Sequence, residues 1–153
     1  MTRILFQMNL ADMRAPYSDP LYDDFKVWLK ALHALAEADT GFLWRYKGED
    51  DDSGHIQPYP CAPLIMGNFS AWRNYDSLYD YTFSDGHLEI MKKKRKWFKK
   101  MKTPYVVLYY GYPLDLLKPK EELLEVAKRK LVHYKKHGET AEAFGFGAHK
   151  GVF

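Results

Sequence analysis

The sequence has one cysteine and no long apolar run. Cys61 is the only cysteine among 153 residues, which excludes an intramolecular disulfide and any zinc or iron–sulfur site built from several cysteines of one chain. No stretch approaches the ~20 apolar residues that cross a bilayer, and the first ten residues lack the apolar core and the cleavage site of a signal peptide. We therefore expect a cytoplasmic protein without a membrane partner.

Several motifs of well-known enzyme classes are missing as well. The sequence contains no glycine-rich phosphate loop, no H-E-x-x-H helix and no G-x-S-x-G turn, so it offers no sign of a nucleotidase, a zincin or an α/β-hydrolase of those types. The six histidines are scattered. His133 and His137 are four residues apart among lysines, and we favour an exposed helix over a metal pair there. No metal site is predicted.

Positive charge is concentrated in one segment. Residues 92–102 carry eight Lys or Arg, and removing these eight from the net charge of +3 leaves the rest of the chain at −5. Cations beside Trp97 could bind nucleic acid by releasing phosphate counterions. We prefer an amphipathic helix whose lysines face water, because Ile90, Trp97 and Met101 share one side at helical spacing. No nucleic-acid partner is predicted.

Length and composition predict one globular domain over residues 1–153, with a substantial core. Hydrophobic residues make up 46% and charged residues 28% of the chain, as in soluble proteins. Aromatic residues reach 16%, which is high and indicates a pocket or an oligomer interface.

Strand-like and helix-like segments alternate along the chain. Strands are predicted over residues 3–10, 41–46, 64–72 and 104–112. Helices are predicted from the Asp19–Pro20 start signal to near residue 41, over 74–83, over 85–101, and from Pro119 to before Gly138. This order is a ferredoxin-like βαββαβ fold of the α+β class with a C-terminal helix, in which helices cover one face of an antiparallel sheet.

The opposite face of that sheet needs a cover. Side chains alternate between the two faces along each predicted strand, and this places large apolar residues on the uncovered face. They include Leu5, Trp44, Leu64, Met66 and Trp72. Large apolar residues of this kind should be shielded from water. A second copy packed sheet to sheet about a two-fold axis would cover them. We therefore expect a homodimer with a barrel-like interior and a cavity in each protomer.

Several segments together resemble one bacterial family. RAPYSDP, DTGFLWRY, NFSAWRNYDSLYDYTF, HLEIMKKKRKWFKKM, PYVVLYY and KKHGETAEAFGF resemble the corresponding blocks of the family catalogued as domain of unknown function 3291. That family is similar to the dimeric α/β-barrel superfamily, which includes antibiotic-biosynthesis monooxygenases, haem-degrading enzymes and aldoxime dehydratases. The resemblance implies this fold and a small-molecule ligand, but no particular reaction.

His87 is the first candidate for a catalytic or cofactor-binding residue. It lies near the centre of the apolar stripe of its predicted helix, where a neutral imidazole could ligate haem iron or act as a general base. A packed histidine bonded to a strand or to Ser84 is the structural alternative. Lys94 and Arg95 follow two turns later and could orient an anionic group, or only snorkel to water.

The other candidates are aromatic, polar and basic residues of the predicted strands and loops. Trp44, Trp72 and Trp97 could form pocket walls or belong to the core. A second set could orient a small substrate if it shares the helix-free face, or could bind itself or water: Gln7, Asn9, Asn68 and Ser70. Arg14 and Arg45 could contact an anion or simply lie on the surface.

Two functions follow from these residues and from the resemblance. The first is a monooxygenase-like small-molecule enzyme acting on a small, largely apolar substrate in a barrel cavity, its cofactor unknown, with haem held by His87 as one variant. The second is a non-catalytic ligand-binding or structural homodimer in which His87 and the tryptophans only pack.

Overall fold

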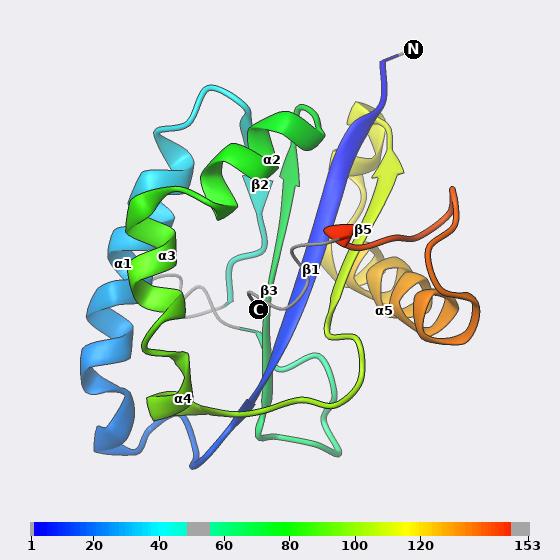
Figure 1. The fold of residues 1–153 in the computed structure, drawn as a ribbon. Coiled ribbons are helices and arrows are strands. Elements are labelled where there is room, and N and C mark those ends of the chain that lie inside the picture. Colours follow the sequence, from blue (N-terminus) through cyan, green and yellow to red (C-terminus); the bar gives the residue numbers. More distant parts are fainter. Residues whose placement is uncertain (1, 49–55, 148–153) are drawn as a thin grey trace.

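The computed structural model describes residues 2–48 and 56–147, and an antiparallel sheet lies at its centre (Figure 1). Its strands are β1 (Ile4–Met13), β2 (Phe42–Arg45), β3 (Ile65–Trp72), β4 (Phe98–Lys99) and β5 (Val106–Gly111). The central strand is β1, which pairs with β3 on one side and with β5 and β4 on the other. The short β2 extends the sheet beyond β3.

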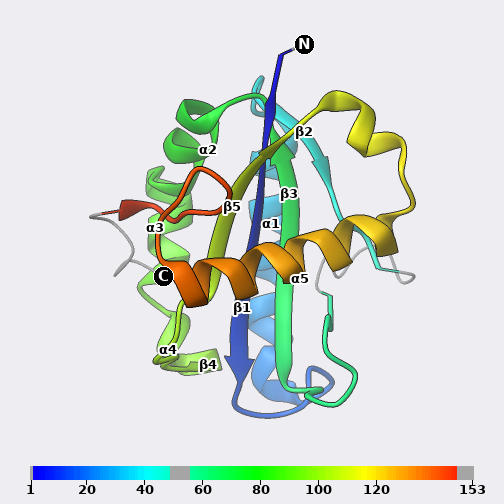
Figure 2. The ribbon, with the colours of Figure 1, turned by 90° about the vertical axis from the view of Figure 1, so that its right-hand side faces the viewer.

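Helices cover both faces of the sheet (Figure 2). One face carries α1 (Asp23–Glu37), α2 (Tyr75–Thr82), α3 (Asp85–Met91) and α4 (Lys94–Trp97), and the other carries α5 (Lys120–His137). Short 3-10 helices, η1 (Pro20–Tyr22) and η2 (Pro113–Leu117), precede α1 and α5. The predicted α+β class and the βαββαβ order with a C-terminal helix are confirmed. Among the described residues, no helix has the length and apolar content to cross a membrane.

The helix ends follow the local signals in the sequence. Asp19 caps η1 by accepting a hydrogen bond from the backbone N–H of Leu21, and Asn74 caps α2 in the same way. Pro119 precedes α5, and Gly138, with φ of 71°, follows its last residue, His137. Together with its ψ of −160°, this is a conformation that only glycine adopts readily.

The prediction of one helix over residues 85–101 is wrong. Helix α3 ends at Met91, the short α4 ends at Trp97, and the next two residues form β4, in which Phe98 pairs with Met13. Trp97 is fully buried, and its indole Nε1 donates to Asp24 at 3.1 Å. This anchor and the pairing with β1 favour the break, and the run of like charges weakens a continuous helix.

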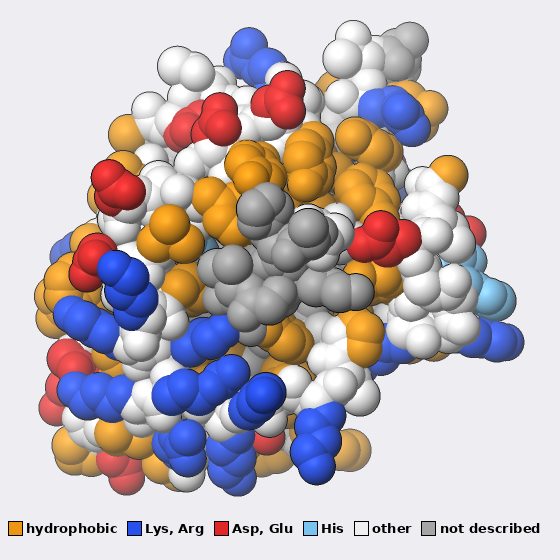
Figure 3. Space-filling view, in the orientation of Figure 1, with side chains coloured by type: hydrophobic (Ala, Val, Ile, Leu, Met, Phe, Trp, Pro, Cys, Tyr) orange, Lys and Arg blue, Asp and Glu red, His pale blue; other side chains and the backbone are white. Residues whose placement is uncertain are grey.

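The basic run itself faces water, as predicted. Of its eight Lys and Arg side chains, all except Lys94 are exposed, and they form the positively charged region beside α3 and α4 in Figure 3. Lys96 forms an ion pair with Asp24. The run therefore serves as the solvated side of this segment.

The expectation of a bare second sheet face is also wrong. Phe6, Phe69 and Val107 of the sheet pack against α5 through Leu123, Ala127, Leu131 and Tyr134, all buried. These four residues recur at helical spacing and give α5 one apolar side. Leu5, Met66 and Trp72, assigned above to the uncovered face, lie instead on the side of α1 to α3. The chain therefore covers its own sheet on both faces.

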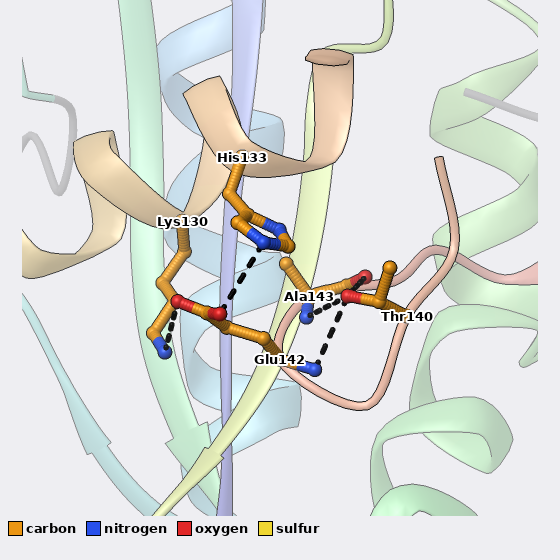
Figure 4. Close-up of polar contacts among 5 residues, drawn as sticks. All are labelled: Lys130, His133, Thr140, Glu142 and Ala143. Atoms are coloured by element: carbon orange, nitrogen blue, oxygen red, sulfur yellow. Dashed lines mark hydrogen bonds and ion pairs between the residues drawn. The ribbon is translucent and has the colours of Figure 1, made fainter. Parts of the chain in front are cut away.

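The segment after α5 is bound to the helix through Glu142 (Figure 4) and to β5 through Phe144. Glu142 lies 3.4 Å from Lys130 and 3.3 Å from His133 of α5, and its backbone N–H donates to the Thr140 hydroxyl. Phe144 then forms a two-hydrogen-bond bridge with Leu108 of β5. This isolated bridge places Phe144 beside β5.

Candidate functional site

Four polar side chains lie together on one face of the sheet. In the register of β1 with β3, Gln7 faces Ser70 and Asn9 faces Asn68. Residues opposite each other across two strands point to the same face. That face carries α1 to α3, so the suggestion that these four residues lie on a helix-free face is wrong. They form a polar floor that helices of the same chain cover.

Three of the four polar residues are joined by hydrogen bonds. The Trp72 indole N–H donates to the Ser70 hydroxyl at 2.9 Å, and the Gln7 amide donates to Ser70 at 3.0 Å and to the Asn68 carbonyl oxygen at 2.7 Å. Among the described residues, the side chain of Asn9 has no hydrogen-bond partner. The network fixes the orientation of Asn68 and leaves amide groups available to a ligand.

The space between floor and roof consists of two adjoining compartments. The first has a volume of about 60 Å³ and the second of about 100 Å³. Both are lined by Asn9, Asn68, His87, Leu29 and Leu32. Their combined size is close to that of a ~150 Å³ apolar cavity that admits benzene. The site therefore suits a small ligand with an apolar body and a few polar groups.

His87 stands at the junction of the two compartments. Its ring makes an edge contact with Tyr81 at 5.2 Å between centroids, and its Nδ1 atom is buried without a hydrogen-bond partner. Burial lowers the pKa of His87 from 6.5 to about 4, while a hydrogen bond with the backbone of Thr82 acts in the opposite direction. At neutral pH the imidazole is uncharged and can accept a proton or a hydrogen bond.

A bulge in β2 decides which side chains reach the pocket. Phe42 pairs with Trp72, but the register then shifts so that Trp44 pairs with Ala71 and Arg45 with Ser70. The extra residue turns the strand by one position. Trp44 consequently packs against Phe69 on the α5 side, at 5.1 Å between ring centroids. Arg45 takes the place on the pocket side and lines the first compartment.

The remaining predicted site residues lie at different places. Trp72 lines the first compartment, whereas Trp97 is sealed in the core around Phe25 and lines neither compartment. Lys94 and Arg95 line the second compartment, and burial together with the charge of Arg95 lowers the pKa of Lys94. Arg14 is exposed, and its Nε donates to the Arg95 carbonyl.

His33 is a pocket residue to which the sequence analysis assigned no role. It lies in α1 and lines the first compartment beside Leu29 and Leu32. Burial and the charge of Arg45 lower the pKa of His33 from 6.5 to about 4. One sequence feature could have identified His33: it lies four residues after Leu29 and therefore on the same side of the helix.

The residues around His87 do not fit a haem group. Pockets that hold drug-sized ligands measure ~300–1,000 Å³, and a haem macrocycle is no smaller than such ligands, whereas the compartments beside His87 measure about 60 and about 100 Å³. Within the described residues, no group of three or more His, Cys, Asp or Glu is arranged to hold a metal ion.

Comparison with known families identifies the chain at the family level. The model of the family described as "Domain of unknown function (DUF3291)" matches residues 4–151. The chain therefore belongs to this family, as its sequence blocks predicted. A search of curated proteins returned no match.

Several solved structures share the fold at low sequence identity. A protein from Shewanella oneidensis is 7% identical with a TM-score of 0.51, and a conserved protein from Methanosarcina mazei Go1 is 14% identical with a TM-score of 0.50; each match covers 72% of this chain and 93% of the other. SnoaB, a cofactor-independent oxygenase from Streptomyces nogalater, is 13% identical with a TM-score of 0.49, over 72% of this chain and 94% of SnoaB. At these identities the likeness concerns the fold alone.

Proposed function

We propose that this member of the DUF3291 family is a small-molecule enzyme of monooxygenase-like type, acting on a small, largely apolar substrate between the sheet and α1 to α3. One observation carries the proposal. The uncharged His87, with an unpartnered buried nitrogen, lies beside Asn9 and Asn68 in a pocket whose other walls are mainly apolar. Such convergent polar groups in an apolar pocket are typical of a reaction site.

In this proposal the neutral imidazole of His87 accepts the proton of a phenolic or enolic hydroxyl. The oxygen anion formed beside it then stabilises the imidazolium. The Asn9 and Asn68 amides supply hydrogen-bond donors to that oxygen. An electron-rich anion of this kind is the species that transfers electrons to O₂.

A simple probe makes the reaction explicit. 1-Naphthol would lose its hydroxyl proton to His87, take up one oxygen atom of O₂ at the ring carbon opposite the hydroxyl, and release the second oxygen atom as water. The product is 1,4-naphthoquinone, so one naphthol and one O₂ give one quinone and one water. O₂ is the only oxidant.

The test measures O₂ consumption and quinone formation with 1-naphthol. His87→Gln should lower the rate by about 100-fold or more, because general-base catalysis contributes typically 10²–10⁴-fold. His137→Gln is the matched control, since His137 is exposed and lines neither compartment. Full activity in His87→Gln would contradict the assignment of the base.

A non-catalytic ligand-binding or structural homodimer is the second candidate. It is favoured by the network in which Gln7, Ser70 and Trp72 satisfy one another's hydrogen bonds. On this alternative, 1-naphthol binds but is never turned over. Light scattering tests the homodimer separately: a mass of twice the chain's 18.0 kDa would support it, and a mass of 18.0 kDa would exclude it.

A further inference from the structure

Unpartnered buried polar atoms gather around the first compartment. Among the described residues that line it, three have a buried side-chain nitrogen without a hydrogen-bond partner: His33 Nδ1, Arg45 Nη1 and His87 Nδ1. All three residues line this compartment of about 60 Å³. Buried polar atoms almost always have partners, and leaving a charged donor unpaired is the costliest exception. The walls of this compartment therefore contain polar groups whose hydrogen-bonding capacity is unused.

The charges around the compartment are complementary to an anion. The Arg45 side chain is 13% exposed, and its Nε pairs with the more exposed Glu37 at 2.7 Å. Glu37 thus neutralises one edge of the guanidinium, while Nη1 keeps no partner. The charges of Arg45 and Lys47 both lower the pKa of His33, and Glu37 only partly opposes them. The local potential is positive.

We infer that the ligand of this pocket is a small carboxylic acid whose carboxylate binds Arg45, with His33 beside it, in the first compartment. A carboxylate is planar and offers two oxygens to the fork of an arginine. The apolar body of the acid then occupies the second compartment, where Ile90, Met66 and Phe98 form the walls. The inference rests on the proposed function for the ligand pocket, and it names the substrate class.

The β2 bulge is what makes this arrangement specific. Without the register shift, regular alternation from Phe42 would place Trp44 on the pocket side and Arg45 on the other. With it, Arg45 lies opposite Ser70 and next to the polar floor. The same backbone irregularity removes an aromatic wall and brings a guanidinium to the pocket.

Calorimetric titration with benzoate and with its uncharged counterpart benzamide tests the inference. The wild-type protein should bind benzoate about tenfold or more tightly than benzamide, because hydrogen bonds to an ionised partner are the stronger ones. Arg45→Gln should abolish this preference and leave the benzamide affinity within about twofold. Arg73→Gln is the matched control, because Arg73 is exposed and lines neither compartment.

A second variant keeps Arg45 in place. Glu37→Gln removes the carboxylate that competes for the guanidinium, so it should tighten benzoate binding about threefold or more without affecting benzamide. This measurement remains decisive if Arg45→Gln fails to fold.

The outcomes separate this inference from the proposed function. Equal binding of benzoate and benzamide would overturn the carboxylate while leaving a ligand pocket. A preference for benzoate that survives Arg45→Gln but disappears in Arg95→Gln would place the anion at the second compartment, and it too would overturn the inference. Binding of neither compound, together with no turnover of 1-naphthol, would overturn both proposals.

Discussion

Acidification should destabilise the fold through the pocket histidines, His87 above all. Its pKa is lowered by burial from 6.5 to about 4 in the folded chain. Between these two values the unfolded chain binds more protons than the folded one. The free energy of unfolding therefore rises with pH across this window and falls as the solution is acidified. Stability from this source is complete above pH 6.5 and lost by about pH 4.

The two pKa values set the size of the effect. Lowering the pH from 7 to 5 should cost about 2 kcal/mol through His87 alone, and the full loss below pH 4 is about 3 kcal/mol. His33 contributes with the same sign, since its pKa is lowered to about 4 as well. Asp24, Glu37 and Asp115 also have lowered pKa values, but their contributions are lost at more acid pH, below the window measured.

Urea unfolding followed by tryptophan fluorescence at pH 7, 6 and 5 measures the dependence. His87→Gln should lose about 2 kcal/mol less than the wild type between pH 7 and pH 5, because Gln has no proton to gain. His137→Gln should follow the wild-type curve, since His137 is exposed. A His87→Gln curve parallel to that of the wild type would refute the placement of a neutral, buried His87.

Three further substitutions address the framework around the site, each checked by urea unfolding at neutral pH. Ser70→Ala removes the acceptor shared by Gln7 and Trp72 and should cost about 1–3 kcal/mol; an unchanged midpoint would mean that water replaces the hydroxyl. Gly138→Ala should cost about 1–3 kcal/mol, because φ of 71° with ψ of −160° strains any side chain; no loss would show that the turn relaxes. Trp97→Phe should cost about 1–3 kcal/mol through the lost indole donor and a small cavity, and a neutral result would contradict its anchoring role.

Much of the fold could be predicted because each element carries its own signal. Asp19 and Pro20 mark the first helix, Gly138 marks the end of the last, and alternation along residues 3–10 marks the central strand. These signals are local, because each depends on a residue and its near neighbours in the chain. The break after Met91 has no such signal. It depends on the Trp97 indole reaching the carboxylate of Asp24, 73 residues earlier in the chain, and helical periodicity cannot represent a contact of that kind.

The prediction that a second chain covers the sheet was wrong for a related reason. Periodicity gives α5 an apolar side through Leu123, Ala127 and Leu131, but it does not say which surface that side meets. A second chain and the chain's own C-terminal helix satisfy the same hydrophobic demand. The sequence pattern therefore predicts that something covers this face of the sheet. Only the three-dimensional path from β5 to α5 shows that α5 of the same chain does so.

The pocket combines both kinds of information. Asn9, Asn68 and Ser70 were predictable because strand alternation places polar residues where a structural sheet would prefer aliphatic ones. Trp44 was grouped with Leu5 and Trp72 on one face of the sheet, and the structure places it on the other face for a definite reason. One extra residue between Phe42 and Trp44 reverses the parity of the residues after it, so that Arg45 takes the pocket side. Because the shift exchanges an indole for a guanidinium at the first compartment, it adds a positive charge to a pocket that already has a polar floor.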